Sequence, residues 1–145
     1  MKIRALLAVC VLASCGSDTD NNPLTEIEQN VIGKWQLQSI SRNGSPYSPG
    51  QCEDQNTIDF KNTGAFSQLN YGILEGTTTC AIDSVVNASY QIENDSIFFT
   101  INTLDTVYKA RVLEVTTDKL RINSRMYMPT EQEGIDEVIF TKITP

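Results

Sequence analysis

The stretch "VIGKWQLQSI" (residues 31–40) sets a pattern that most of the chain repeats. Polar and apolar residues alternate from Lys34, which places Trp35 and Leu37 on one face and Lys34 and Gln36 on the other. Alternation with a period of two is typical of a β-strand that buries one face. We therefore predict a strand here whose tryptophan points into a core.

Similar short segments follow along the chain, separated by stretches rich in Gly, Pro, Ser, Asn and Asp. They predict further strands at 57–60, 65–71, 89–92, 97–101, 107–115, 120–128 and 137–143. Ahead of the first strand, residues 24–32 predict a short helix with Thr25 as its cap and Glu28 three residues later. The longer segments 41–50, 72–80 and 129–136 are expected to be loops.

Closely spaced strands and no predicted internal helix indicate an all-β fold. A meander with tight turns, such as the one at Gly64, is antiparallel, and closure into a barrel removes its unpaired edges. The sequence thus predicts one domain over residues 24–145, an antiparallel up-and-down β-barrel of about eight strands.

Charge and composition exclude several kinds of function. The 145 residues carry 11 Lys and Arg against 18 Asp and Glu, a net charge of −7. Nucleic-acid binding needs a basic surface, so we expect none. The chain has no histidine, which removes Ser-His-Asp and Cys-His catalysis and histidine-based zinc sites. We expect no enzyme activity, no metal and no cofactor.

The N-terminus has the layout of a secretory signal: Lys2 and Arg4, then the apolar run "ALLAVCVLA" (residues 5–13). The next residues complete "LASC", ending at Cys15, which resembles the lipobox of bacterial lipoproteins. That resemblance implies a signal peptide over residues 1–14 and lipidation of Cys15, including palmitate. Two or three acyl chains hold a protein firmly in a bilayer.

Residues 15–23 are then expected to be the lipidated cysteine and a flexible tether, because "GSDTDNNP" is polar. Asp18 and Asp20 resemble the export signals by which some Bacteroidetes lipoproteins reach the cell surface. We therefore expect a lipid anchor in the outer membrane, with the periplasmic and the surface-exposed face both left open.

Two cysteines lie beyond the anchor, Cys52 and Cys80. An even pair in an exported chain predicts a disulfide. No adjacent basic residue is present to activate either thiol, which argues against a reactive pair.

The first strand and its surroundings resemble the lipocalins, and the wider frame resembles the small lipocalin-like domain of many Bacteroidetes lipoproteins. In lipocalins a Gly-x-Trp signature begins the first strand, and its tryptophan packs across the closed end of the barrel. The features that carry this resemblance are Gly33-Lys34-Trp35, Cys52, "TIDF" (57–60), "NTGAF" (62–66), Cys80, "SYQIENDSI" (89–97) and "VLEVTTDKLRI" (112–122). The resemblance also implies an arginine stacked on Trp35, for which Arg121 and Arg125 are the candidates.

Aromatic residues at inward positions are the candidates for a ligand cavity. They are Trp35, Phe60, Phe66, Tyr90, Phe99 and Tyr108. In a barrel this small the same side chains are equally able to fill the interior.

Two functions stay open. One is binding of a small apolar ligand or envelope component. The other is a filled barrel that recognises a protein or glycan through loops 41–50 and 129–136. We expect a monomer.

The sequence also offers candidates for acid–base or calcium sites and for glycosylation sites. The carboxylates at Glu53-Asp54 and in residues 131–137 lack the contrast of apolar and polar surroundings that acid–base catalysis needs, and no calcium-loop spacing is present.

Three tripeptides, at 83–85, 95–97 and 105–107, resemble the Asp-Ser/Thr-aliphatic acceptor of O-glycosylation in Bacteroidetes. They make Ser84, Ser96 and Thr106 candidate sites, provided that these residues lie in exposed turns.

Overall fold

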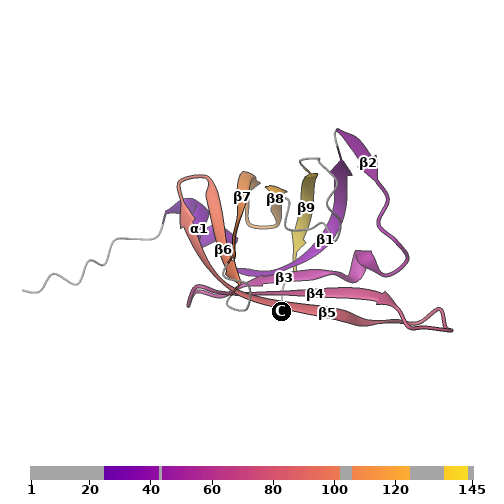
Figure 1. The fold of residues 1–145 in the computed structure, drawn as a ribbon. Coiled ribbons are helices and arrows are strands. Elements are labelled where there is room, and N and C mark those ends of the chain that lie inside the picture. Colours follow the sequence, from indigo (N-terminus) through magenta and orange to yellow (C-terminus); the bar gives the residue numbers. More distant parts are fainter. Residues whose placement is uncertain (1–24, 43, 102–105, 125–135, 144–145) are drawn as a thin grey trace, which may run out of the picture.

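The computed structural model describes residues 25–42, 44–101, 106–124 and 136–143 (Figure 1). A short helix precedes nine strands, and one 3-10 turn lies between the second and the third strand. The elements are α1 (Glu26–Val31), β1 (Gly33–Arg42), β2 (Ser45–Tyr47), η1 (Glu53–Gln55), β3 (Thr57–Phe60), β4 (Ala65–Ile73), β5 (Cys80–Glu93), β6 (Ser96–Ile101), β7 (Thr106–Val115), β8 (Lys119–Ser124) and β9 (Asp136–Lys142).

Eight of the strands form a closed antiparallel barrel. Neighbours pair in the order β1-β3-β4-β5-β6-β7-β8-β9, and β9 pairs back to β1. The ninth strand, β2, folds back on the end of β1. The predicted all-β, up-and-down barrel is therefore confirmed, with one additional strand.

Helix α1 lies at one end of the barrel, directly before β1 (Figure 1). Thr25 and Glu28 form the predicted capping box, in which the Thr25 amide donates to Glu28 Oε2 at 2.6 Å. The chain enters β1 at Gly33 with φ 130°, a conformation that favours glycine. A Cβ there would lie 2.7 Å from Lys142 Cε. Gly33 thus lets the helix and the last strand approach closely.

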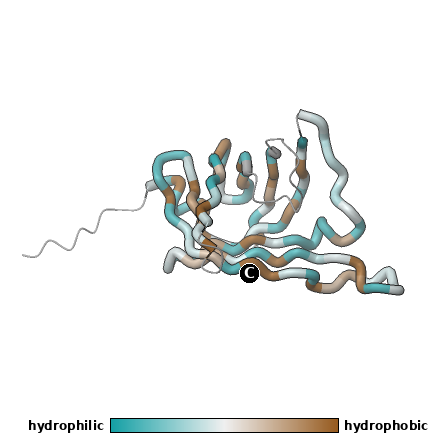
Figure 2. The backbone as a smooth tube through the Cα atoms, viewed as in Figure 1, coloured by the Kyte–Doolittle hydropathy of each residue, from teal (hydrophilic) through white to brown (hydrophobic). Residues whose placement is uncertain are grey.

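The core fills the barrel between the strands. Apolar and polar positions alternate along them, as Figure 2 shows, and the apolar set points inward. The bulkiest of the fully buried side chains are Trp35, Phe60, Phe99 and Phe140. Tryptophan and phenylalanine bury the largest apolar areas of any side chains, so these four residues dominate the packing.

Strands β4 and β5 continue well beyond their neighbours. Strand β3 pairs with β4 as far as Leu69, and β6 pairs with β5 only from Ser89. Residues 70–88 therefore form a hairpin extension, here called the β4–β5 arm, which projects from the barrel on the side away from α1 (Figure 1). A β-bulge interrupts its pairing between Asn70 and Tyr71.

Two of the predicted loops contain more structure than expected. Segment 41–50 includes β2, because Gly44 adopts φ 78° and permits a tight turn after β1. Segment 72–80 is shortened from both sides by β4 and β5, and β5 begins nine residues before its predicted start at Ser89. The turn η1 was also not predicted. Within the described ranges, no helix has the length and apolar character needed to span a membrane.

Candidate functional site

The six candidate aromatic residues all belong to the inner face of the barrel. Four of them, Phe60, Phe66, Tyr90 and Phe99, pack directly on one another. The ring centroids of Phe66 and Phe99 are 4.7 Å apart, and those of Phe60 and Tyr90 are 5.0 Å apart. These distances are typical of aromatic pairs in protein cores. At the α1 end the aromatic side chains therefore fill the barrel themselves.

Trp35 is fully buried at the same end. Its indole Nε1 donates to the Val31 carbonyl at 2.8 Å, which ties the end of α1 to the first strand. Lys142 Nζ lies 4.8 Å from the centre of the indole ring and donates to the Asn30 carbonyl at 3.2 Å. Trp35 thus packs across the barrel end, as the resemblance to lipocalins implied.

Arg121, one of the two candidates for an arginine stacked on Trp35, does not lie over that ring. The Arg121 guanidinium pairs with Glu114 at 3.2 Å and with Glu137 at 2.9 Å. Arg121 lies one position along β8 from Leu120, which is buried, so its side chain faces outward. Lys142 supplies the cation over Trp35 instead. The other candidate, Arg125, lies outside the described residues.

Several inward-facing side chains at the opposite end of the barrel, called the open end below, are only partly buried. Ile101 and Tyr108 face the interior there, and Val86 lies on the inner side of the adjoining arm. Gln68, which is 6% exposed, donates to Asn70 Oδ1 at 2.8 Å. The open end therefore combines apolar surface with a small amide network.

A hollow of about 350 Å³ lies at the α1 end of the barrel. It is called the α1 groove below. Three segments contribute its lining residues, which are Glu28, Ile32, Asn62, Gly64, Tyr90, Gln91, Ile92 and Glu93. Tyr90 joins it to the core, because its ring packs on Phe60 and its hydroxyl donates to the Lys61 carbonyl at 2.8 Å. Sequence reasoning missed this groove, because no pattern in the chain links the three segments.

Among the described residues, four titratable groups have clearly shifted pKa values. Burial, and to a lesser extent the Glu28 carboxylate, raises the pKa of Tyr90. Hydrogen bonds from Arg111 and Ser96 lower the pKa of Asp95. Bonds from Lys119 and Arg121 lower the pKa of Glu114, and the same network raises the pKa of Arg121. Both shifted carboxyls are therefore held as ion-paired carboxylates.

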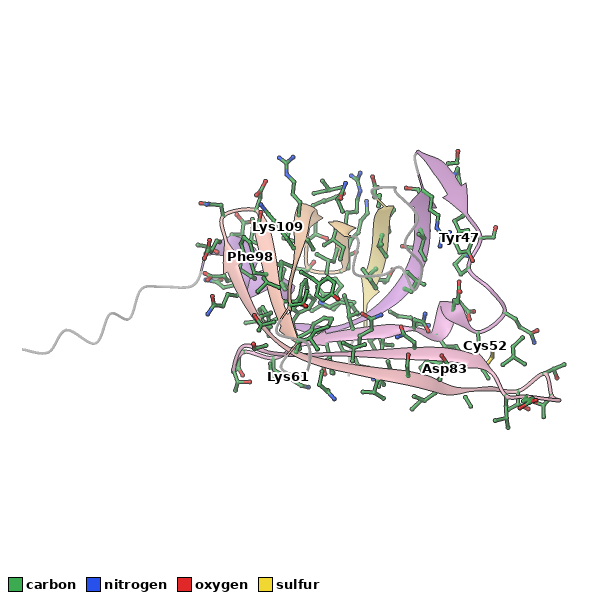
Figure 3. The ribbon with its side chains drawn as sticks, viewed as in Figure 1. Tyr47, Cys52, Lys61, Asp83, Phe98 and Lys109 are labelled. Carbon is green, nitrogen blue, oxygen red and sulfur yellow. A yellow bond between two sulfur atoms is a disulfide. The ribbon has the colours of Figure 1, made fainter. Side chains whose placement is uncertain are left out.

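The predicted disulfide is present between Cys52 and Cys80, with a Cα–Cα distance of 5.5 Å. It joins the residue before η1 to the first residue of β5, next to the loop at the tip of the β4–β5 arm (Figure 3). Because Asn56 Oδ1 also accepts from the Tyr71 amide at 2.6 Å, the arm is tied twice to the segment before β3. Cys15 lies outside the described residues.

The three candidate glycosylation residues do not share one environment. Ser84 lies within β5 rather than in the predicted turn, and it is exposed. Ser96 is 6% exposed, and its hydroxyl donates to Asp95 Oδ1 at 3.0 Å, so the expected exposure is wrong for this residue. Thr106 is exposed at the start of β7. Only Ser84 and Thr106 are accessible as acceptors.

The acidic candidates are also placed. Glu53 and Asp54 form part of η1, where Glu53 Oε2 accepts from the Gly50 amide at 2.8 Å. Glu137 belongs to β9 and pairs with Arg121, and residues 131–135 lie outside the described ranges. In the part of the chain that the structure describes, no group of three or more His, Cys, Asp or Glu residues is arranged to hold a metal ion.

Comparison with known proteins agrees with this architecture. A family model described as a lipocalin-like domain matches residues 31–122. A lipocalin-like protein from Bacteroides uniformis superposes with a TM-score of 0.53 at 19% identity, covering 79% of this chain and 99% of its own. A protein from Bacteroides eggerthii superposes with a TM-score of 0.51 at 17% identity, covering 77% and 98%. None of the curated proteins matches significantly. The closed barrel, the buried tryptophan of β1 and the family match together show that this chain belongs to the lipocalin-like domain family.

Proposed function

We propose that this protein is a non-catalytic, lipid-anchored lipoprotein of the bacterial outer membrane that holds a small apolar molecule at the open end of its barrel. The family and the barrel support a binding role. The contrast along the barrel axis supports the location, because the α1 end is closed by its own aromatic side chains. The open end also carries inward-facing apolar side chains that are only partly buried.

The partial exposure of inward-facing apolar residues at that end carries the proposal. Tyr108 pairs with Phe99 across β6 and β7, yet Phe99 is 2% exposed whereas Tyr108 is only partly buried. Ile101 lies in the same half of the barrel, and Val86 lies on the inner side of the adjoining arm. Because the aromatic cluster occupies the depth of the barrel, the bound molecule should be small and sit near the mouth.

The ligand is tested by native mass spectrometry of the full-length protein, purified from its own membranes in mild detergent. We expect an added mass that is lost on denaturation. Tyr108→Ser should abolish that mass, whereas Val107→Ser on the outer face of the same strand should retain it, since Val107 is 60% exposed. Bare protein in repeated preparations would refute the ligand role.

The anchor is tested separately. Cys15→Ala should release the protein from membranes and stop incorporation of radioactive palmitate. Cys10→Ala is the matched control, because Cys10 lies in the proposed signal peptide and is not the proposed attachment site. Firm membrane binding by Cys15→Ala would refute lipid anchoring without affecting the ligand test.

The charged groups support a role without catalysis. General acid catalysis at neutral pH needs a carboxyl group with a raised pKa. Among the described residues, the carboxyls with resolved pKa shifts are Asp95 and Glu114, and both are shifted downward by basic partners. Neither lines the α1 groove.

A second candidate function is recognition of a protein partner through the outer surface. The observation that favours it is the β4–β5 arm, where Ile73, Ile82 and Val85 are 53%, 54% and 52% exposed. Ile82 lies opposite Tyr71 and Val85 lies opposite Leu69, so these apolar residues share the outer face of the hairpin. This function would be favoured if mass spectrometry shows no bound ligand and if one protein partner copurifies with the native chain but not with Ile82→Ser.

A further inference from the structure

The α1 groove has an unusual balance of charge for a hollow of its size. Two of its lining residues, Glu28 and Glu93, are acidic, and none of the lining residues is basic. Glu28 Oε2 accepts the capping bond from the Thr25 amide, which leaves Oε1 for another donor. Among the described residues, neither carboxylate has an ion-pair partner.

Three basic side chains at this end of the barrel are engaged elsewhere, and Lys34, exposed at the start of β1, does not line the groove. Lys61, on the turn that contributes Asn62 and Gly64 to the groove, pairs with Asp59 (Figure 3). Arg111 pairs with Asp95 at 2.7 Å. Lys142 donates to the Asn30 carbonyl and covers the Trp35 ring. The groove carboxylates are therefore left for a cation from outside the chain.

The rest of the lining suits an aliphatic body. Ile32 and Ile92 provide apolar surface, and the Tyr90 ring is held by its edge-on contact with Phe60 and its bond to the Lys61 carbonyl. Glu28 and Tyr90 line the same groove, and the Glu28 carboxylate contributes to raising the pKa of Tyr90. An ammonium group near aromatic and carboxylate groups, joined to a methylene chain on apolar surface, satisfies all of these features.

We propose that the α1 groove binds a linear alkyl diamine or polyamine, with its ammonium groups near Glu28 and Glu93 and its methylene chain over Ile32, Ile92 and Tyr90. This site lies at the opposite end of the barrel from the proposed apolar ligand, so it does not depend on that ligand. The net negative charge of the protein also attracts a cationic ligand of this class.

The test is isothermal titration calorimetry of the full-length protein in mild detergent with 1,5-diaminopentane at about 10 mM salt, where charges are weakly screened. We expect saturable binding of one diamine per chain. Binding should weaken strongly at about 150 mM salt, where the Debye length falls to about 8 Å. The uncharged analogue 1,5-pentanediol should not bind.

Matched variants identify the groove. Glu93→Gln and Glu28→Gln should each weaken diamine binding roughly three- to fivefold, the size expected for partly solvated charge pairs. Glutamine at position 28 still completes a capping box, so the helix should remain intact. Glu26→Gln on the same helix removes an equal charge outside the groove and should leave binding unchanged.

Three results would overturn the proposal. One is the absence of saturable diamine binding, and another is binding of pentanediol as tightly as diaminopentane. The third is equal weakening by Glu26→Gln and Glu93→Gln, which would mean a general attraction of cations to an acidic protein. Position 93 belongs to β5 and not to the helix. Glu93→Gln therefore tests diamine binding at the groove even if Glu28→Gln disturbs α1.

Discussion

The two ends of strands β4 and β5 lie in opposite environments. At the α1 end, Phe66 on β4 packs against Phe60 and Phe99 and is 4% exposed. On the β4–β5 arm, Ile73 of the same strand is 53% exposed. The difference lies in the neighbours, because β3 and β6 flank the hairpin only at the barrel end. Apolar side chains therefore build a core at one end and an accessible surface at the other.

The largest effect should come from the aromatic cluster at the α1 end. Phe99→Ala should lower the free energy of unfolding by about 3–5 kcal/mol, because it leaves a cavity between Phe60 and Phe66. Phe98→Ala is the matched control, since the neighbouring ring is partly exposed and faces outward below Lys109. Urea denaturation measures both. A loss below about 1 kcal/mol for Phe99→Ala would show that the barrel is hollow at this end.

Loss of the disulfide should have the next largest effect. Replacing Cys52 and Cys80 by Ser should destabilise the protein by roughly 3–4 kcal/mol in the chain-entropy model, because the bond closes a loop with a sequence separation of 28. Hydrogen exchange should accelerate most in residues 80–88, with protection retained best at Phe60 and Phe99. Equal acceleration in both regions would mean that the arm and the core unfold as one unit.

The outer face of the arm should contribute little to stability. Ile82→Ala should change the free energy of unfolding by no more than about 0.5 kcal/mol, because that side chain is already 54% exposed. Ile97→Ala, at a fully buried position of β6, is the comparison and should cost about 2–5 kcal/mol. A loss above about 1 kcal/mol for Ile82→Ala would place the arm within the stable core.

The smallest effect concerns the ion pair between Asp95 and Arg111. Because the folded-state pKa of Asp95 is lowered, its stabilising contribution is complete above the unfolded pKa of about 3.9 and is lost as pH falls through the lower folded value. Asp95→Asn should therefore be slightly less stable than the native protein at pH 7, and the difference should shrink towards pH 3. Asp83→Asn on the arm is the control. If the stability difference between Asp95→Asn and the native protein stayed constant from pH 7 to pH 3, the ion pair would not be its cause.

Much of the barrel was predictable because its strands alternate cleanly. Strand β3 occupies the predicted range of residues 57–60, and the capping residues of α1 are Thr25 and Glu28, as predicted. In these segments the inward positions are apolar and the outward positions are mostly polar, so the one-dimensional pattern reflects the three-dimensional burial. The disulfide was also predictable, since only two cysteines lie beyond the proposed anchor.

The arm and the groove were not predictable for physical reasons. On the arm, Ile82 and Val85 face solvent while Ser84 lies on the inner side, so alternation no longer reports burial. The bulge at Asn70 and Tyr71 also shifts the register by one residue. The α1 groove and the Lys142 contact with Trp35 join segments that are distant along the chain, and no local pattern encodes such contacts.

The disulfide beside the tip of the arm also governs what happens if a protease cuts the protein. The loop Leu74–Thr79 is exposed throughout and lies between the two bonded cysteines in sequence. A cut there yields two polypeptides, one with Cys52 and the other with Cys80, that stay covalently joined. Each also keeps its own strands in the barrel, so a nicked molecule would migrate as a full-length chain until a reductant separates the pieces.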